Sequence, residues 1–398
     1  MISIMKHRIL AILSAAALLV ACTEDFIGQY PVDNVAPAPV SGVQVENLPG
    51  SAVISYSLPN ETDLLYVKAV YTDSHGTKTE VKSSVFKDNV VLKGFGRSQK
   101  QTVQLFAVDA SENESTPVSV EIEPQDSPIY SIMESLNVYE SWGGFKMEWD
   151  NPLQEQIIMY VYQKTDEGWV PLETIASSTE SGLTAVRGLA SEPTEFQIRL
   201  RDIYDNYAED LTTTLTPLYE IQLPSDKLSV LPLPTGYKWS GYTNPLPALF
   251  DDVTTADKPV YLDPSNPQPQ YMSISLGGLY KLSRVRFWGR VKYCYGLHNP
   301  RHFQFWGTAD DEAGNNPNTF DGWTLILDDW SIKPSGLNPD GTPGTVTAED
   351  QAYANGGEEY EIPESIPPIK YFRMVCLQTW SNSKAFHLNE LRFWGQEK

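Results

Sequence analysis

Three stretches in the last 170 or so residues place aromatic side chains among small polar residues. They are Tyr237–Tyr242, Tyr293–Asn299 and Thr379–Phe386. An aromatic plane can stack on the apolar face of a ring-shaped ligand such as a sugar, while amide, imidazole and guanidinium groups bond its hydroxyls. The candidates for such contacts are Trp239, Tyr242, Tyr293, Tyr295, His298, Asn299, Arg301, Trp380, Asn382 and Phe386. The alternative for each aromatic residue is ordinary packing, which is the commoner role of such a side chain.

Strands must hold these stretches in place, and the same tripeptide occurs at the end of three predicted strands. Phe-Trp-Gly ends the segments Lys281–Gly289, Gln304–Gly307 and Arg392–Gly395. Aromatic and β-branched residues alternate there with polar ones, and a Gly stops each run, which is typical of β-strands. Side chains two apart share a face, so one face carries Val285, Phe287, Phe303, Phe305, Leu391 and Phe393, and the other Arg286, Trp288, Gln304, Trp306, Arg392 and Trp394. The first face is predicted to form the interior of a sandwich, and the second to carry cross-strand pairs or lie under a loop.

The composition favours an all-β protein. The 398 residues include 29 Pro, 26 Gly, 21 Tyr and 10 Trp, and long helical runs of Ala, Glu, Lys and Leu are missing. The formal net charge of −22 repels phosphate backbones, which argues against nucleic-acid binding.

Two segments of similar pattern precede the last domain. Val43–Glu123 and Tyr130–Leu218 each contain short alternating strands separated by turn residues, as in a sandwich of about 90 residues. The strand ends at Asp109 and Asp202 are each followed by an Asn four residues on, and this turn resembles that of fibronectin type III modules. The predicted boundaries are residues 42–124 for the first module, 125–222 for the second and 223–235 for a Pro-rich linker.

The chain begins with the features of a secretion signal. Lys6 and Arg8 precede an apolar run, Ile9–Val20, that is too short to span a bilayer. The run ends in Leu-Val-Ala-Cys22, which resembles the lipobox of bacterial lipoproteins. That resemblance implies removal of residues 1–21 and acylation of Cys22. The alternative is an ordinary signal peptide with a chance cysteine.

The residues after Cys22 indicate where the protein is exported. The acidic stretch Thr23–Asp25 resembles the export tag of surface lipoproteins in the Bacteroidetes. Residues 22–41 are Pro-rich and predict a semi-extended tether. Acyl chains can anchor a protein stably without a spanning helix. We therefore expect a lipid-anchored protein of the outer membrane, exposed at the cell surface.

Residues 236–398 resemble the discoidin-like, or coagulation factor type C, sandwich. The motifs that carry the resemblance are Pro247–Asp252, Tyr271–Gly277, Tyr280–Phe287, Asn299–Gly307, Asp321–Ile326, Lys370–Val375 and His387–Gly395, in the family's order. Ser275 stands where the family often has Asp. The resemblance implies a jelly-roll β-sandwich of the kind that also serves galactose-type carbohydrate-binding modules, with ligand contacts in loops at one end.

The same resemblance implies a structural calcium ion between an early acidic loop and the closing strand. Calcium takes about six to eight oxygen ligands. The candidate ligands are Asp251, Asp252, Thr254 and Glu390. The alternative is that the two aspartates only form a turn.

Two features of the last domain have no single interpretation. Cys294 and Cys376 could form a disulfide in an oxidising compartment, or Cys376 could be a buried free thiol in an apolar strand. Residues 333–360 are rich in Gly, Pro, Asn and acidic residues and form an unusually long connection. We interpret them as a mobile flap that covers the binding face or is inert.

The whole layout resembles surface glycan-binding lipoproteins of polysaccharide-utilisation systems. Those proteins accompany an outer-membrane transporter and a glycan-capture lipoprotein. The expected function is non-catalytic capture of a polysaccharide or oligosaccharide by the last sandwich, and the alternative is protein adhesion by a discoidin-like domain. Glycoside cleavage would need two carboxylates about 5–10 Å apart in a cleft, and no segment is large enough for a typical catalytic barrel. The acidity favours a neutral or galactose-type sugar.

Overall fold

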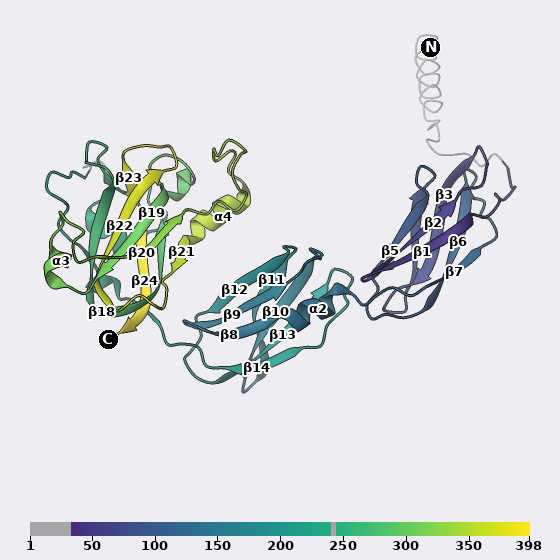
Figure 1. The fold of residues 1–398 in the computed structure, drawn as a ribbon, viewed down its shortest axis with the longest axis horizontal. Helices are drawn as coiled ribbons and strands as arrows, with labels where there is room; N and C mark the ends of the chain where they lie inside the picture. The colour runs from purple at the N-terminus through teal and green to yellow at the C-terminus, as the bar shows by residue number, and fades with distance from the viewer. Residues whose placement is uncertain (1–32, 240–243) are drawn as a thin grey trace, which may run out of the picture. The chain divides into compact units, whose positions relative to one another are not determined.

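The computed structural model describes residues 33–239 and 244–398. The signal peptide, Cys22, most of the tether and Tyr242 therefore lie outside the described residues. Within those two ranges, no helix is both long enough and apolar enough to cross a membrane. Antiparallel β-sheets dominate the structure, which confirms the predicted all-β class (Figure 1).

The chain divides into two compact units. The first comprises the residues up to 136 together with 149–182 and 197–212, and the second comprises 137–148, 183–196 and 213–398. The boundary passes through the segment that the sequence predicts to be the second module. The predicted module boundaries remain predictions.

Two sheets of the first unit enclose one apolar core. Their strands, in spatial order, are β1 (Ser41–Leu48), β2 (Ser51–Ser57) and β5 (Asn89–Lys93) in one sheet, and β4 (Lys78–Ser84), β3 (Leu64–Thr72), β6 (Gln101–Asp109) and β7 (Val118–Ile122) in the other. Alternate residues of each strand point inward, so that Ile54 of β2 and Val67 of β3 are fully buried in the same cluster. This is the sandwich that the alternation predicts.

The middle of the chain carries a helix and two more sheets. These elements are α2 (Pro128–Ser135); the sheet β11 (Gly168–Ser177), β10 (Ile157–Thr165), β13 (Thr194–Asp202) and β14 (Leu211–Leu215); and the sheet β12 (Ser181–Arg187), β9 (Gly144–Asp150) and β8 (Asn137–Ser141). Buried and partly exposed side chains alternate along β13, as a strand with one covered face requires.

A large sheet organises residues 213–398. Its order is β15 (Ile221–Gln222), β24 (Glu390–Glu397), β18 (Gln270–Trp288), β22 (Ile369–Thr379), β19 (Pro300–Thr308) and β20 (Thr324–Trp330), while β16 (Ser229–Val230) and β21 (Glu358–Glu361) also pair with β18. A two-stranded ladder joins β17 (Val260–Leu262) to β23 (Phe386–Leu388). Short helices are η1 (Ser225–Lys227), η2 (Leu246–Phe250), η3 (Val291–Tyr293), α3 (Asp311–Asn315) and α4 (Ala348–Gly356).

Strand β18 is long because its two parts pair mainly with different neighbours. Its first part pairs with β22 up to Ser275, and its second part pairs with β24 from Tyr280 onward. Gly277 lies between the two parts at φ +74°, and a Cβ there would lie 2.5 Å from the carbonyl oxygen of Lys227. Glycine is needed here because its backbone adopts a positive φ easily and because a side chain would clash with Lys227.

The predicted division of faces is confirmed. The side chains predicted for the interior, Val285, Phe287, Phe303, Phe305, Leu391 and Phe393, are at most 1% exposed and share one core. On the other face, the Arg284 guanidinium lies 4.0 Å from the Trp394 ring centroid and 2.8 Å from a carboxylate oxygen of Glu220. Arg392 lies 4.7 Å from the Trp288 ring. These cation–π contacts are the cross-strand rungs of the second face.

The expectation of a mobile flap at residues 333–360 is wrong. Lys333 and Asp350 form an ion pair at 2.8 Å with both side chains at most 2% exposed. Thr347 and Asp350 make a reciprocal capping box at the start of α4, and β21 pairs with β18 beside that helix (Figure 1). The ion pair holds two points of the segment to each other, because a buried charge needs its partner to stay in place. The pairing of β21 with β18 and the hydrogen bond from the Trp288 indole N–H to the Asn355 carbonyl, at 3.0 Å, tie the segment to the sheet.

Candidate functional site

Two of the three aromatic stretches come together at the loop end of the sheet. The backbone N–H of Trp380 donates to the carbonyl of Asn299 at 3.0 Å, and that of His387 donates to the carbonyl of His298 at 3.1 Å. Tyr295 and Asn382 have positive φ angles, as does Leu297 between them in sequence. Non-glycine residues in this region are strained and are held there by their surroundings. The two loops therefore form one constrained surface.

An inner layer of these loops is buried. Tyr295 and Trp380 are 4% and 5% exposed and meet edge to face, with ring centroids 5.2 Å apart. The indole N–H of Trp380 donates to the Ser331 hydroxyl at 3.2 Å. The prediction that Tyr295 and Trp380 present their rings to a ligand disagrees with this burial, because each ring is already occupied by the other. They instead position the loops around them.

Asn299 and Phe386 also belong to the inner layer. The Asn299 side chain accepts the Arg290 backbone N–H at 2.6 Å and contacts the buried His387 ring at 2.6 Å. Phe386 is 1% exposed and lies in the main core. Burial lowers the pKa of His387 to about 3, so that the ring is neutral at pH 7. These residues hold the loops together and are not accessible to a ligand.

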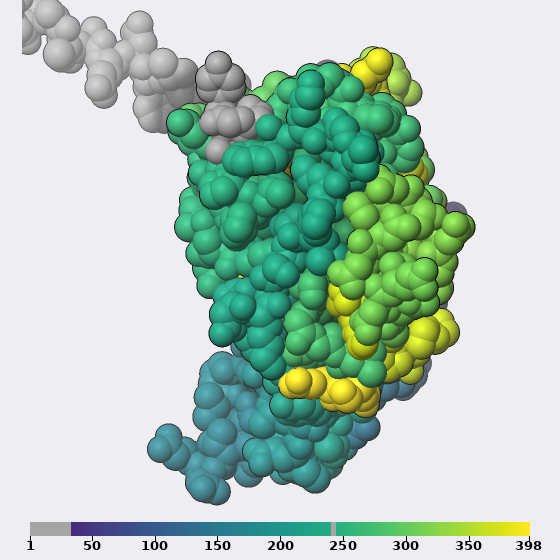
Figure 2. Space-filling view, turned by 90° about the vertical axis from the view of Figure 1, so that its left-hand side faces the viewer, coloured from purple at the N-terminus to yellow at the C-terminus, as the bar shows by residue number. Residues whose placement is uncertain are grey.

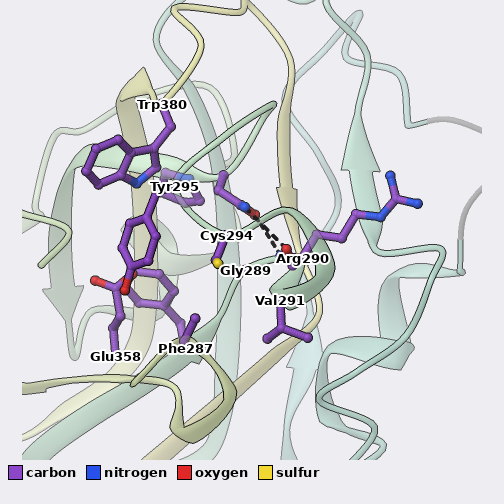
Figure 3. A pocket seen from close by; sticks show the side chains of 11 residues that line it. Phe287, Gly289, Arg290, Val291, Cys294, Tyr295, Glu358 and Trp380 are labelled. Carbon is purple, nitrogen blue, oxygen red and sulfur yellow. Dashed lines mark hydrogen bonds between the residues drawn. The ribbon is translucent and has the colours of Figure 1, made fainter. Parts of the chain in front are cut away.

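A small cavity lies below the inner layer (Figure 3). It measures about 20 Å³, and Cys294, Tyr295, Glu358 and Trp380 line it while the Arg290 side chain points away. A space of that size holds one water molecule, not a sugar ring. Burial raises the pKa of Glu358 to about 6, although its carboxylate accepts hydrogen bonds from Ser331, Ile332 and Tyr360.

The two cysteines of this domain are free thiols. Both Cys294 and Cys376 are buried, and Cys376 lies on β22 within the main core. Burial raises the pKa of the Cys376 thiol to about 12. Of the two alternatives, a disulfide and a buried free thiol, the structure has the second.

An outer layer keeps surface for a ligand. Tyr293 is 43% exposed, and Asn382 is exposed as well. Trp239, from the remaining stretch, forms a β-bridge with Leu262 and is 41% exposed. His298 and Arg301 are half-buried. Burial lowers the pKa of His298, whose Nδ1 lies 2.7 Å from the Ser383 hydroxyl. A neutral imidazole, an amide and two aromatic rings are groups that can contact a polyhydroxylated ring.

The predicted metal ligands surround a buried carboxylate. Glu390 on β24 is 1% exposed, and burial, with Asp252 and Asp251 nearby, raises its pKa to about 7. Its Oε2 and the buried Oδ1 of Asn389 accept no hydrogen bond from the described residues. Nε of Arg392 lies 3.3 Å from Oε1 of Glu390.

A hard cation would suit the two unpaired oxygens, and Arg392 already supplies one positive charge. Its Nη2 lies 3.0 Å from Asp252. Thr254 offers its backbone carbonyl, which accepts from Asn389 at 2.8 Å. Among the described residues, no three His, Cys, Asp or Glu side chains stand close enough to hold a metal ion. The donor set therefore fits calcium only if backbone carbonyls complete it.

Comparison with known proteins places the chain in a family. Family models for three domains of unknown function match residues 37–124 (DUF4959), 125–226 (DUF5126) and 250–395 (DUF5000). No curated protein matches the chain. The solved structure of SusE-like protein BT2857 is 30% identical, and the match covers 68% of this chain and 100% of that one, with a TM-score of 0.42. The chain belongs to the SusE-like proteins.

Other solved structures match this chain at lower identity. The module CBM32-3 from a family 31 glycoside hydrolase of Clostridium perfringens is 16% identical, with 44% of this chain and 95% of that chain covered and a TM-score of 0.32. The family 32 carbohydrate-binding module of C. perfringens NanJ, solved with galactose, is 13% identical, with 44% and 99% covered and a TM-score of 0.29.

The surface of the last domain is closed on the face drawn in Figure 2. Side chains of the described residues cover that face, and no deep cleft opens there. Contacts on a surface of this kind must come from side chains that project outward.

Sequence reasoning missed one group of outward side chains. Trp330 on β20 is 47% exposed and stacks on His302 of β19, with centroids 4.3 Å apart and planes 5° apart. The alternation along residues 302, 304 and 306 was a signal for this group. The partner strand could not be assigned from it.

Proposed function

We propose that this SusE-like protein is a non-catalytic surface lipoprotein that binds a polysaccharide or oligosaccharide through its last sandwich. The observation that carries the proposal is the 30% identity that extends over the full length of a SusE-like protein. The resemblance of the layout to glycan-binding lipoproteins of polysaccharide-utilisation systems supports the same function. The partners would be a glycan, an outer-membrane transporter and a glycan-capture lipoprotein.

The outer layer of the loops would make the contacts. The rings of Trp239 and Tyr293 would stack on sugar faces, and Asn382, His298 and Arg301 would bond hydroxyl groups. All five have surface left for a ligand. Tyr295, Trp380, Asn299 and Phe386 would act through them as positioning residues.

Acylation of Cys22 would anchor the chain in the outer membrane. The lipobox and the acidic residues after it support this anchor. Several acyl chains bind a bilayer stably without a spanning helix. Labelling with a fatty-acid analogue should modify the wild type and leave Cys22→Ala unlabelled. Surface protease should then reach the wild type on intact cells.

A calcium ion would be held by Glu390, one of Asp251 and Asp252, and the carbonyl of Thr254. It would supply positive charge to oxygens that lack partners in the interior. The role would be structural, since these residues lie at the closing strand and not among the exposed rings.

Binding to glycan panels tests the central proposal. Wild type, Tyr293→Ala, Trp239→Ala and Phe86→Ala are run on gels that contain neutral plant, microbial or host glycans. Phe86 is 95% exposed in the first unit, so its removal controls for loss of a surface ring. Each loop variant should bind roughly two- to tenfold more weakly, the value of an aromatic contact, and Phe86→Ala should match the wild type.

Three outcomes count against the proposal. Binding that is the same in both loop variants would move the site elsewhere. Retention on a protein panel and on no glycan would support adhesion instead. New reducing ends released from a bound glycan would indicate an enzyme.

A further inference from the structure

The outer face of β19 and β20 carries a row of side chains that the core does not use. The two strands are antiparallel, with His302 opposite Trp330, Gln304 opposite Asp328, and Trp306 opposite Leu325. β20 is the last strand of the sheet order, so no further strand from residues 33–239 or 244–398 covers this edge. Because Phe303 and Phe305 point into the core, the intervening side chains of β19 point away from it.

Trp330 is a rigid ring with free surface. One side of its indole lies flat against the His302 imidazole at 4.3 Å, the Arg301 guanidinium lies 5.7 Å from its ring centroid, and the residue remains 47% exposed. A Trp side chain is one of the largest apolar groups, and folding gains little from one that stays half in water. An aromatic plane held at fixed orientation and left open is what a sugar face stacks against.

A chain of hydrogen bonds fixes the polar groups beside that ring. The Trp306 indole N–H donates to Gln304 Oε1 at 3.0 Å, and Gln304 Nε2 donates to Asp328 Oδ2 at 2.7 Å. Asp328 Oδ1 lies 2.6 Å from His302 Nε2. The bonds from Gln304 and His302 lower the pKa of Asp328, so that it is ionised at neutral pH.

These hydrogen-bonded side chains are held in place without a ligand. Immobilising side chains is part of the cost of binding, and here the protein has already met it. Each carboxylate oxygen can accept a second hydrogen bond, so Asp328 keeps acceptor capacity for hydroxyl groups. Residues 302 to 306 span about 14 Å at the rise of a strand, which is longer than a single hexose ring.

We propose that Trp330, His302, Asp328, Gln304 and Trp306 form a second glycan-binding surface, on the strand face beside the loop residue Arg301, that takes an internal stretch of a neutral polysaccharide. We call these five residues the strand platform. An open strand face has no wall to stop a chain, so several sugar units can lie along it. The carboxylate of Asp328 is 43% exposed and disfavours a uronic or sulfated chain.

The inference rests on the proposed glycan binding and deepens it. Two surfaces on one chain make the affinity for a long glycan exceed that for a short one, because the second contact becomes intramolecular. The strand platform therefore predicts a dependence on chain length that the loops alone do not give.

The test uses a glycan that retards the wild type in the gel experiment. It measures the Kd of the full-length mature protein for short and long oligomers of that glycan. Isothermal titration compares a disaccharide with an octasaccharide for wild type, Trp330→Ala, Asp328→Asn, Tyr293→Ala and Phe86→Ala. Trp330→Ala should raise the Kd for the octasaccharide roughly tenfold and leave the disaccharide unchanged. Asp328→Asn keeps the shape of the side chain and should raise the octasaccharide Kd several-fold.

The outcomes separate the two proposals. If wild type binds glycan and Trp330→Ala keeps the full gain in affinity from the disaccharide to the octasaccharide, the proposal of the strand platform is overturned and the loop site stands. If wild type binds no glycan, both are overturned. If Trp330→Ala changes only self-association in sedimentation, the surface is an interface between copies and the glycan assignment is overturned. Melting temperatures within 2 °C or so of wild type, as expected for half-exposed positions, exclude misfolding as the cause.

Discussion

Glu390→Gln should change how the stability of the last sandwich depends on pH. The folded protein holds a proton on Glu390 up to about pH 7, and the unfolded chain releases it near its ordinary value of 4.5. Folding therefore takes up a proton between these values. The contribution of Glu390 to the free energy of unfolding is largest below about pH 4.5, falls as the pH rises to 7, and is constant above.

The size of the effect follows from the two pKa values. Their difference corresponds to at most about 3 kcal/mol at 1.36 kcal/mol per unit. A domain of this size loses roughly 2–4 °C in Tm for each kcal/mol. Glutamine imitates the protonated side chain, so the Tm of Glu390→Gln relative to that of the wild type should rise by up to roughly 6–12 °C between pH 4.5 and pH 7.5.

Differential scanning calorimetry of both proteins at several pH values measures this difference. His387 and Glu358 also titrate, with pKa values of about 3 and 6 in the folded protein. Their contributions are common to both proteins and cancel in the comparison. The control Glu358→Gln should alter the profile below pH 6 and leave the range from 6 to 7 as in the wild type.

Calcium gives the same experiment a second readout. A cation at Glu390 favours the ionised carboxylate, so millimolar calcium should raise the Tm of the wild type at pH 7.5 and flatten its pH profile. Glu390→Gln should not respond. Parallel pH profiles in the two proteins would refute the argument from burial, and equal calcium shifts would place any bound ion elsewhere.

Three further predictions concern the interior of the same domain. Trp380→Ala should cost about 3–5 kcal/mol of stability, because it empties a buried site, and denaturant unfolding would expose the error if the cost were under 1 kcal/mol. Lys333→Met leaves the buried Asp350 carboxylate without its cation and should cost about 3–5 kcal/mol, whereas a double variant with Asp350→Leu should recover part of that loss in the same assay. Cys294 and Cys376 should react with a thiol reagent only after unfolding, and rapid labelling of the native protein would contradict their burial.

Local patterns in the sequence predicted the strands and their inner faces. Val285 and Phe287, two residues apart, had to share a face of any strand, and both are buried. The period of two is a property of the extended backbone, so no knowledge of partners was needed. The same reasoning placed Arg392 and Trp288 opposite that core, where they form a cation–π pair.

The orientation of the loop residues could not be predicted in this way. Tyr293 and Tyr295 are also two apart, but Tyr293 is 43% exposed and Tyr295 is 4% exposed. Tyr295 has a φ of +55° and faces Trp380, which is 85 residues away in sequence. Loops have no fixed period, and their side chains follow contacts made by distant segments.

The strand platform could also be predicted only in part from local sequence. Alternation placed Gln304 and Trp306 on an outer face, but nothing local indicated that Trp330 would stack on His302. That pair depends on the register of β19 and β20, and on β20 being the last strand of the sheet order.

The sequence by itself determined the all-β class, the core face of each Phe-Trp-Gly strand and the aromatic character of the loops, because these follow from residue type and backbone period. Only the tertiary structure decided which rings remain open to solvent, that Cys294 and Cys376 stay apart as thiols, and that residues 333–360 are held to β18 through β21. Exposure and pairing are set by what packs against a side chain, and those neighbours come from remote parts of the chain.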